Sequence, residues 1–179
     1  MRQLFLGLIL LGTTSLMAQG KYGATTADSV KCWENYNIFG SLIQTKNYSD
    51  AYEYWNYVYT NCPGAQKNTF IYAPRVLEAK IDEAATEGEK KQFVDQLIES
   101  YETRLIHFPG KEAYVVGEKA SKTLKYTDDY ESAFNLFKRA YDADYTEMTP
   151  AQLNGYFLSS VKMFNDKKLD LEQLIGVYL

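Results

Sequence analysis

The stretch from Trp55 to Gly64 reads WNYVYTNCPG, and the stretch from Tyr101 to Gly110 reads YETRLIHFPG. In each copy an aromatic residue stands eight positions before a Pro-Gly pair, and apolar residues with helical spacing lead into it. The copies begin 46 residues apart, at positions 55 and 101. A segment that recurs at an interval of this length is typical of helical hairpins that stack on one another. The repeat therefore predicts an all-α fold of stacked antiparallel helical hairpins.

The first 20 residues, MRQLFLGLILLGTTSLMAQG, have the order of a secretory signal peptide. A basic residue at Arg2 precedes an apolar stretch from Leu4 to Leu11, and small or polar residues surround Ala18. The apolar part is shorter than the ~20 residues of a membrane-spanning helix. We expect residues 1–18 to be removed, and residues 21–179 to form an exported domain, periplasmic or secreted, with no integral membrane span.

Composition limits the kinds of partner. The 179 residues include 19 Lys and Arg and 23 Asp and Glu, which gives a net charge of −4. Binding to nucleic acid depends on clustered basic side chains that displace counterions from phosphates. The acidic balance therefore predicts that nucleic acid is not a partner. The chain that remains after cleavage is long enough for about three or four helical repeats.

Apolar residues at helical spacing mark eight segments, and no alternating run indicates a strand. Asp28 or Ser29 is the expected cap of the first helix, Ser49 or Asp50 caps the second, and Pro74 suits the first turn of the third. The expected helices span about 29–44, 51–62, 70–85, 88–108, 112–124, 129–140, 150–164 and 171–178.

The two cysteines, Cys32 and Cys62, lie on the first two predicted helices. Their midpoint is position 47, in the turn between those helices. An antiparallel hairpin places positions equidistant from its turn side by side, so the two side chains should meet at the open end. Because export favours oxidation, we predict a disulfide between them. Two small buried thiols that never oxidise are the alternative.

The second helix of each hairpin carries a small residue, an aromatic residue four positions later, and then a proline. This pattern resembles the tetratricopeptide repeat, and the resemblance implies a tetratricopeptide-like α-solenoid of about four repeats whose helices pack through these positions. The first match is Ala51, Trp55 and Pro63. The second is Leu97, Tyr101 and Pro109, with a larger residue at its first position, and the third is Ala133 and Phe137, with Tyr145 where the proline would stand. The intervals of 46 and 36 residues exceed the ~34-residue unit, which implies longer helices or loops in the first two repeats.

The segments KYGATTADSVKC and YVYTNCPGAQKNTFIY are also similar to exported tetratricopeptide-type proteins of Bacteroidota. That resemblance covers most of the chain after the predicted cleavage site and implies a location in the cell envelope. The last predicted helix is still apolar at Leu179, whereas solenoids usually finish with a polar capping element. We therefore expect this chain to be truncated at its C-terminus, as the first part of a longer repeat protein, or else to dock its end on a partner.

Residues for catalysis are scarce. His107 is the only histidine, and no motif for a nucleophile, a zinc site or a phosphate-binding loop is present. His107 stands in the last turn of a predicted helix, where its side chain can interact favourably with the helix dipole. The sequence therefore predicts a non-enzymatic protein with no cofactor and no metal.

Repeat scaffolds of this kind bind other molecules, so we expect a protein or peptide partner in the cell envelope. The groove should be lined by the first helix of each hairpin. The expected contact residues are Asn35, Tyr36, Tyr114, Lys119 and Tyr156. Capture of carbohydrate or another nutrient is the alternative, because the chain has 16 tyrosines whose rings could stack on sugars.

Overall fold

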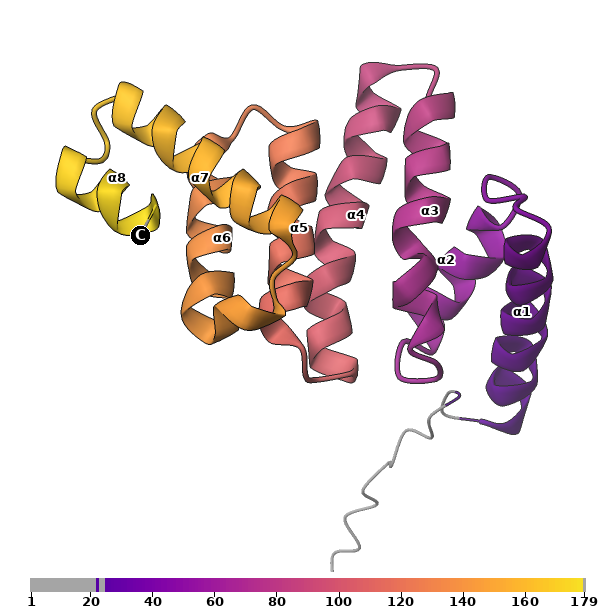
Figure 1. The fold of residues 1–179 in the computed structure, drawn as a ribbon. Helices are drawn as coiled ribbons and strands as arrows, with labels where there is room; N and C mark the ends of the chain where they lie inside the picture. The colour runs from indigo at the N-terminus through magenta and orange to yellow at the C-terminus, as the bar shows by residue number, and fades with distance from the viewer. Residues whose placement is uncertain (1–21, 23–24, 179) are drawn as a thin grey trace, which may run out of the picture.

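The computed structural model describes Tyr22 and residues 25–178, and every regular element in this part is helical (Figure 1). The predicted all-α fold is therefore confirmed. The predicted signal peptide, residues 1–18, lies outside the described residues. The elements are α1 (Thr26–Gln44), α2 (Tyr52–Asn61), α3 (Asn68–Glu83), α4 (Glu87–His107), α5 (Glu112–Tyr126), α6 (Tyr130–Asp144), the 3-10 helix η1 (Tyr145–Glu147), α7 (Pro150–Asn165) and α8 (Leu171–Tyr178).

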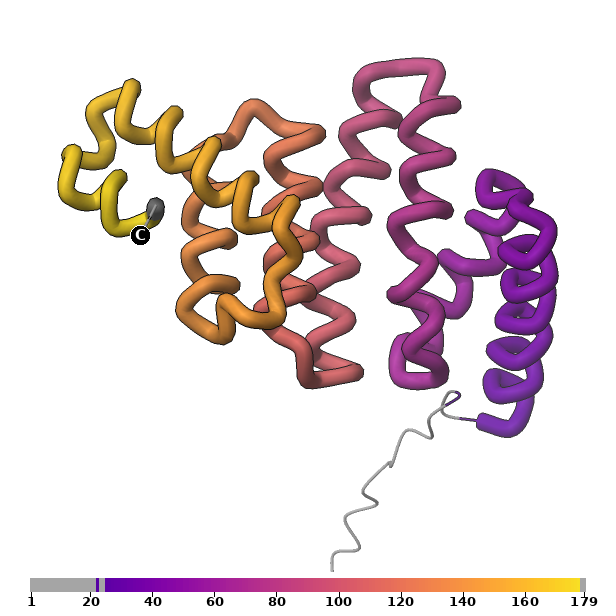
Figure 2. Tube along the Cα trace, in the orientation of Figure 1, coloured from indigo at the N-terminus to yellow at the C-terminus, as the bar shows by residue number. Residues whose placement is uncertain are grey.

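The helices follow one another along the molecule in chain order (Figure 2). Three sequential pairs pack closely, namely α1 with α2, α3 with α4, and α5 with α6, and α7 lies against both α5 and α6. Side chains also join helices that are two elements apart, such as α2 to α4, α3 to α5, and α4 to α6. Phe39 of α1 also meets Tyr72 of α3, with ring centroids 6.4 Å apart. Helices α1, α3 and α5 therefore share one side of the molecule, which we call the odd-helix side.

Contacts between neighbouring hairpins span intervals close in length to those of the sequence repeat. Tyr52 Oη donates a hydrogen bond to Gln96 Oε1 at 3.1 Å, across 44 residues of chain. Lys122 Nζ donates to Glu78 Oε1 at 2.9 Å, also across 44 residues. The bond that joins α4 to α6 spans 37 residues. The second hairpin is thus joined to the third across intervals of both 44 and 37 residues, so these contacts span lengths close to the sequence intervals without a uniform shortening along the chain.

Trp55 occupies the centre of the first core and is fully buried. Its indole Nε1 donates a hydrogen bond of 2.7 Å to the backbone oxygen of Thr69, which fixes α2 against the start of α3. The indole also stacks on Tyr59, with ring centroids 5.0 Å apart. Phe39 and Ile43 of α1 belong to the same apolar cluster, so one side chain of α2 packs beneath both α1 and α3.

The apolar positions of the repeat pattern all lie in the interior, and the prolines follow helix ends. Pro63 comes directly after the C-cap of α2, and Pro109 comes directly after the C-cap of α4. Helix α6 ends without a proline, because Tyr145 begins η1 in its place. The buried members are Ala51, Trp55, Leu97, Tyr101, Ala133 and Phe137.

Two glycines allow α7 to approach its neighbours. A Cβ atom at Gly155 would lie 2.5 Å from Cζ of Phe137, and one at Gly117 would lie 2.7 Å from Cδ of Gln152. Real Cβ contacts are longer, and the Phe137 ring is fully buried and has no free space to move into. The missing side chains therefore set the distance of α7 from α5 and α6.

The structure corrects the predicted cap of α1. Thr25 is the N-cap, and its Oγ1 accepts a hydrogen bond from the backbone N of Asp28 at 3.1 Å. Asp28 Oδ2 in turn accepts from the backbone N of Thr25 at 3.1 Å. This is a capping box, so Asp28 serves as its third helical residue rather than as the cap.

Two other boundaries differ from the predictions. Helix α2 begins at Tyr52 with Ala51 as N-cap, and neither Ser49 nor Asp50 caps it. Helix α3 begins at Asn68, so Pro74 lies inside the helix instead of in its first turn. Apolar spacing locates a helix well but does not show how far its first turns extend.

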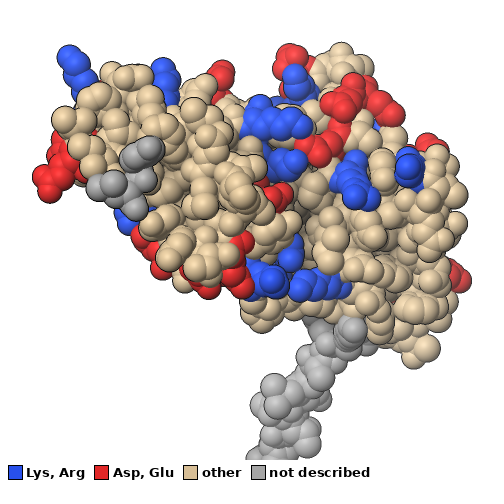
Figure 3. Space-filling view, viewed as in Figure 1, with Lys and Arg blue, Asp and Glu red and all other residues tan. Residues whose placement is uncertain are grey.

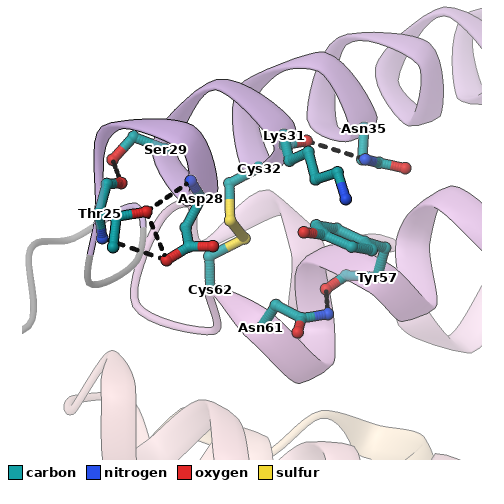
Figure 4. The surroundings of a disulfide bond; sticks show 9 residues. All are labelled: Thr25, Asp28, Ser29, Lys31, Cys32, Asn35, Tyr57, Asn61 and Cys62. Carbon is teal, nitrogen blue, oxygen red and sulfur yellow. Dashed lines mark hydrogen bonds between the residues drawn. A yellow bond between two sulfur atoms is a disulfide. The ribbon is translucent and has the colours of Figure 1, made fainter.

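Cys32 and Cys62 form a disulfide that joins α1 to the end of α2, as predicted (Figure 4). Their Cα atoms are 6.3 Å apart, and both side chains are buried beside Val58 and Ala65. The bond closes the open end of the first hairpin. Because the closed loop has a sequence separation of 30, it removes much of the freedom of the unfolded chain.

Replacement of both cysteines by alanine should lower the free energy of unfolding by about 3 to 4 kcal/mol, because the loop is no longer closed in the unfolded chain. Urea denaturation of the oxidised protein and of the double variant measures the difference. Equal midpoints for the two proteins would show that the bond contributes nothing to stability.

Alanine should have opposite effects at two helical glycines. Gly155→Ala should destabilise the protein by about 2 kcal/mol, because the added carbon overlaps the Phe137 ring. Gly40→Ala should stabilise it by about 0.5 to 1 kcal/mol, because a Cβ there meets nothing within 4 Å. Chemical denaturation of both variants provides the comparison, and a gain in stability at Gly155 would contradict the packing of α7.

Candidate binding groove

An open groove of about 340 Å³ runs between α1 and α3. None of the side chains that line it is charged. The lining consists of Tyr36, Asn37, Phe39, Gly40, Ser41, Ile43 and Gln44 from α1, with Asn68 and Tyr72 from α3.

Helical spacing explains how α1 serves both the core and the groove. Phe39 and Ile43 are four positions apart and are buried in the first core. Asn37 and Ser41, also four apart, point to the groove from an adjacent stripe of the same helix. The buried stripe fixes α1 in place, so the positions of the groove residues are set by the packing of the core.

The polar side chains of the groove have no partners within the described residues. The groove holds the amides of Asn37, Gln44 and Asn68, together with the Ser41 hydroxyl. None of these groups forms a hydrogen bond or an ion pair with another described residue, and the same holds for the hydroxyl groups of the two lining tyrosines. Amides both donate and accept, so the groove presents unused groups of both kinds to solvent or to a ligand.

Gly40 forms part of the groove wall within a helix of 19 residues. A glycine inside a helix costs about 1 kcal/mol relative to alanine. Close packing does not account for this glycine, because a Cβ there would meet nothing within 4 Å. The missing side chain instead leaves the backbone of α1 open to whatever occupies the groove.

An aromatic surface continues from the groove along α1. The Trp33 side chain is half exposed and stacks on Tyr36, with ring centroids 6.1 Å apart. Tyr22 meets the same indole edge-on at 6.0 Å. On the α3 side, the Arg75 guanidinium lies 5.7 Å from the centre of the Tyr72 ring. The groove is therefore flanked by aromatic rings on both helices.

The structure places two of the predicted contact residues near each other on α1. Tyr36 lines the groove. Asn35 is half buried, and its Nδ2 donates to the backbone oxygen of Lys31 at 2.8 Å, as Figure 4 shows. The Asn35 amide is therefore bonded within its own helix.

The other three predicted contact residues lie elsewhere. Tyr114 is partly buried against the first core. Lys119 pairs with Glu102 at 2.9 Å and lines a different pocket, between α4, α5 and α6. Tyr156 is 5% exposed and packs on Phe134 at 5.4 Å, so its prediction as a surface residue is wrong. The helical stripe to which Tyr156 belongs faces α6, which the apolar pattern of α7 alone did not reveal.

Sequence reasoning missed most of the groove. Asn37, Gly40, Ser41 and Gln44 form a polar stripe at helical spacing beside the apolar stripe of α1, and that stripe was a usable signal. The contribution of α3 was not readable from the chain, because it depends on how α3 packs beside α1.

Further along the odd-helix side, the surface becomes charged. Figure 3 shows basic and acidic side chains close together over the middle of the molecule. Glu78 Oε1 accepts hydrogen bonds from Lys122 and Lys125 at 2.9 Å and from Tyr126 at 2.8 Å. Burial alone would raise the pKa of Glu78, but these three bonds and the Lys122 charge outweigh it and lower the pKa to about 2. This cluster ties α3 to α5.

The described residues form no cluster of side chains that could hold a metal ion. No group of three His, Cys, Asp or Glu side chains there is arranged to hold a metal ion. His107 is the last residue of α4, and its ring stacks on Phe70 at 6.4 Å. Within the same part of the chain, no helix is both long enough and apolar enough to cross a membrane.

Comparison with known proteins adds no relative: no family model, no curated protein and no solved structure matches this chain. The groove must therefore be interpreted from its own chemistry.

Acid should weaken the contact between α3 and α5. The pKa of Glu78 is about 2 in the folded protein and 4.5 as its ordinary value. The folded state thus favours the carboxylate, and its stabilisation is complete above pH 4.5 and is lost as the pH falls towards 2. We expect a loss of about 1 to 2 kcal/mol, since solvent screens a side chain that is still partly exposed.

Urea denaturation between pH 2 and pH 6 measures this loss. Glu78→Gln should be less stable than the wild type at pH 6 and similar to it near pH 2. A constant difference across that range would show that the Glu78 carboxylate does not carry the effect.

Proposed function

We propose that this chain is an exported, non-enzymatic helical-repeat scaffold that binds a protein or peptide partner in the cell envelope. The partner occupies the groove between α1 and α3. The observation that carries the proposal is the set of six polar side chains there, none of which bonds to another described residue: Tyr36, Asn37, Ser41, Gln44, Asn68 and Tyr72.

A tetratricopeptide-like α-solenoid of about four repeats is part of this proposal. Its support is the pairing of sequential helices and the contacts between helices two elements apart. Export is supported by the disulfide between Cys32 and Cys62, because such bonds persist in oxidising compartments.

An extended peptide matches the groups that the groove presents. Each peptide unit offers one N–H donor and one C=O acceptor, and side-chain amides such as those of Asn37 and Asn68 can pair with both. The rings of Tyr36 and Tyr72 supply apolar surface for side chains of the bound segment. Because no lining residue is charged, the fitting segment is uncharged.

Carbohydrate binding is the second candidate, favoured by the same aromatic surface. Sugar hydroxyl groups pair with amides, and the apolar faces of sugars stack on aromatic rings. Trp33, which is half exposed and stacked on Tyr36, offers such a face beside the groove. A peptide is preferred because the side-chain amides of the groove match both the N–H and the C=O group of each peptide unit.

Filling the groove should abolish binding without harming the fold. Gly40→Gln places a helix-favouring side chain where a Cβ has open space. We expect the wild-type protein to bind uncharged peptides on a peptide array, and the variant to bind them at least about tenfold more weakly, which corresponds to about 1.4 kcal/mol. Gly176→Gln is the matched control, because Gly176 is also helical, with open space around it, and lies in α8.

A glycan array probed with the same three proteins separates the two candidates. Glycan binding that Gly40→Gln removes, with no peptide binding, would establish the carbohydrate function instead. Equal binding by the wild type and Gly40→Gln on both arrays would overturn the groove as the functional site.

A further inference from the structure

Arg104, in the last turn of α4, is a buried cation without a partner among the described residues. Only 8% of its surface is exposed. Its side chain forms no hydrogen bond or ion pair with them, and its Nε atom is sealed from solvent without an acceptor. The two Nη atoms are not among the buried unpaired atoms, so the end of the guanidinium reaches solvent.

The side chains around Arg104 do not pair with its guanidinium. Tyr114, Tyr101 and Glu118 lie close enough to Arg104 to act on it electrostatically. Glu118 is the only carboxylate among them, and its Oε1 accepts a hydrogen bond of 2.8 Å from Gln152 Nε2 instead. Tyr101 is 4% exposed, and its hydroxyl is also buried without a partner.

Cations elsewhere on α5 and α6 are paired. Lys119 and Lys122 each lie 2.9 Å from a glutamate oxygen, and Arg139 lies 2.7 Å from Glu112. A buried charge without a counter-ion is costly, because desolvation is not repaid by attraction. Arg104 therefore stands out as a group whose partner is not supplied by the described residues.

We propose that Arg104 binds the carboxylate group of a ligand through its solvent-facing Nη atoms. A guanidinium has only donors, in a planar fork that matches two oxygen atoms of one oxyanion. The negative charge of Glu118 disfavours groups with two charges, so a singly charged carboxylate fits better than phosphate or sulfate. This site is separate from the uncharged groove and does not depend on the proposed function.

The proposal makes opposite predictions for stability and for binding. Arg104→Met removes an unpaired buried charge, so it should raise the thermal midpoint in chloride. It should also abolish the response to a carboxylate. With sodium acetate as the probe at constant ionic strength, the wild-type midpoint should rise by about 3 to 6 °C at ten times the dissociation constant, and the variant midpoint should not.

Two further variants complete the test. Arg139→Met removes an arginine that is already paired, so it should keep the acetate response. Arg104→Lys keeps the charge but loses the fork, so it should keep only part of the response. Phosphate and sulfate at the same ionic strength should produce smaller shifts than acetate.

Three results would overturn the proposal. An equal acetate response in the wild type and Arg104→Met would show a general effect of the salt. A lower midpoint or failure to fold for Arg104→Met in chloride would show that Arg104 stabilises the interior. A larger response to phosphate or sulfate than to acetate would show that the site prefers a different oxyanion.

Discussion

The arrangement of α1, α2 and α3 depends on the packing of Trp55 beneath α1 and α3. The indole fills the space under Phe39 and Ile43, and its hydrogen bond to the Thr69 carbonyl fixes where α3 begins beside α1. The disulfide joins α1 to the end of α2, where the chain leads into α3. These contacts together fix the positions of α1, α2 and the start of α3 relative to one another. The groove is the consequence, with polar side chains above an apolar floor.

Charge is distributed unevenly along the odd-helix side. One part of this surface is uncharged, and the next part carries a charged cluster. Between α1 and α3 the lining is uncharged and its polar groups are unbonded. Between α3 and α5, three donors converge on Oε1 of Glu78, which accepts a hydrogen bond from each of them. Arg104, in the last turn of α4, is a further exception, because its side chain is buried and its Nε atom has no acceptor. Polar groups that lack a hydrogen-bond partner within the protein are the candidates for contact with a ligand.

Much of the fold was readable from the sequence, because apolar periodicity and hairpin symmetry are local or nearly local properties. They predicted the eight α-helices and the meeting of Cys32 with Cys62. Capping was less readable, since Thr25 forms a box that Asp28 only completes. The burial of Tyr156 depends on how α7 crosses α6, and that crossing is set by the contact of Gly155 with the Phe137 ring. A contact between two helices cannot be predicted from the periodicity of either one. The contribution of α3 to the groove wall could not be predicted for the same reason.

Photo-crosslinking in the native envelope tests the central claim most directly. A photoreactive side chain at position 37 or 68 would lie in the groove, whereas the same side chain at Asn154, an exposed amide position in α7, would not. The account predicts one discrete adduct, of the same mass, from the two groove positions and none from position 154. Adducts from position 154 alone, or from all three positions equally, would contradict the assignment of the groove between α1 and α3 as the binding site.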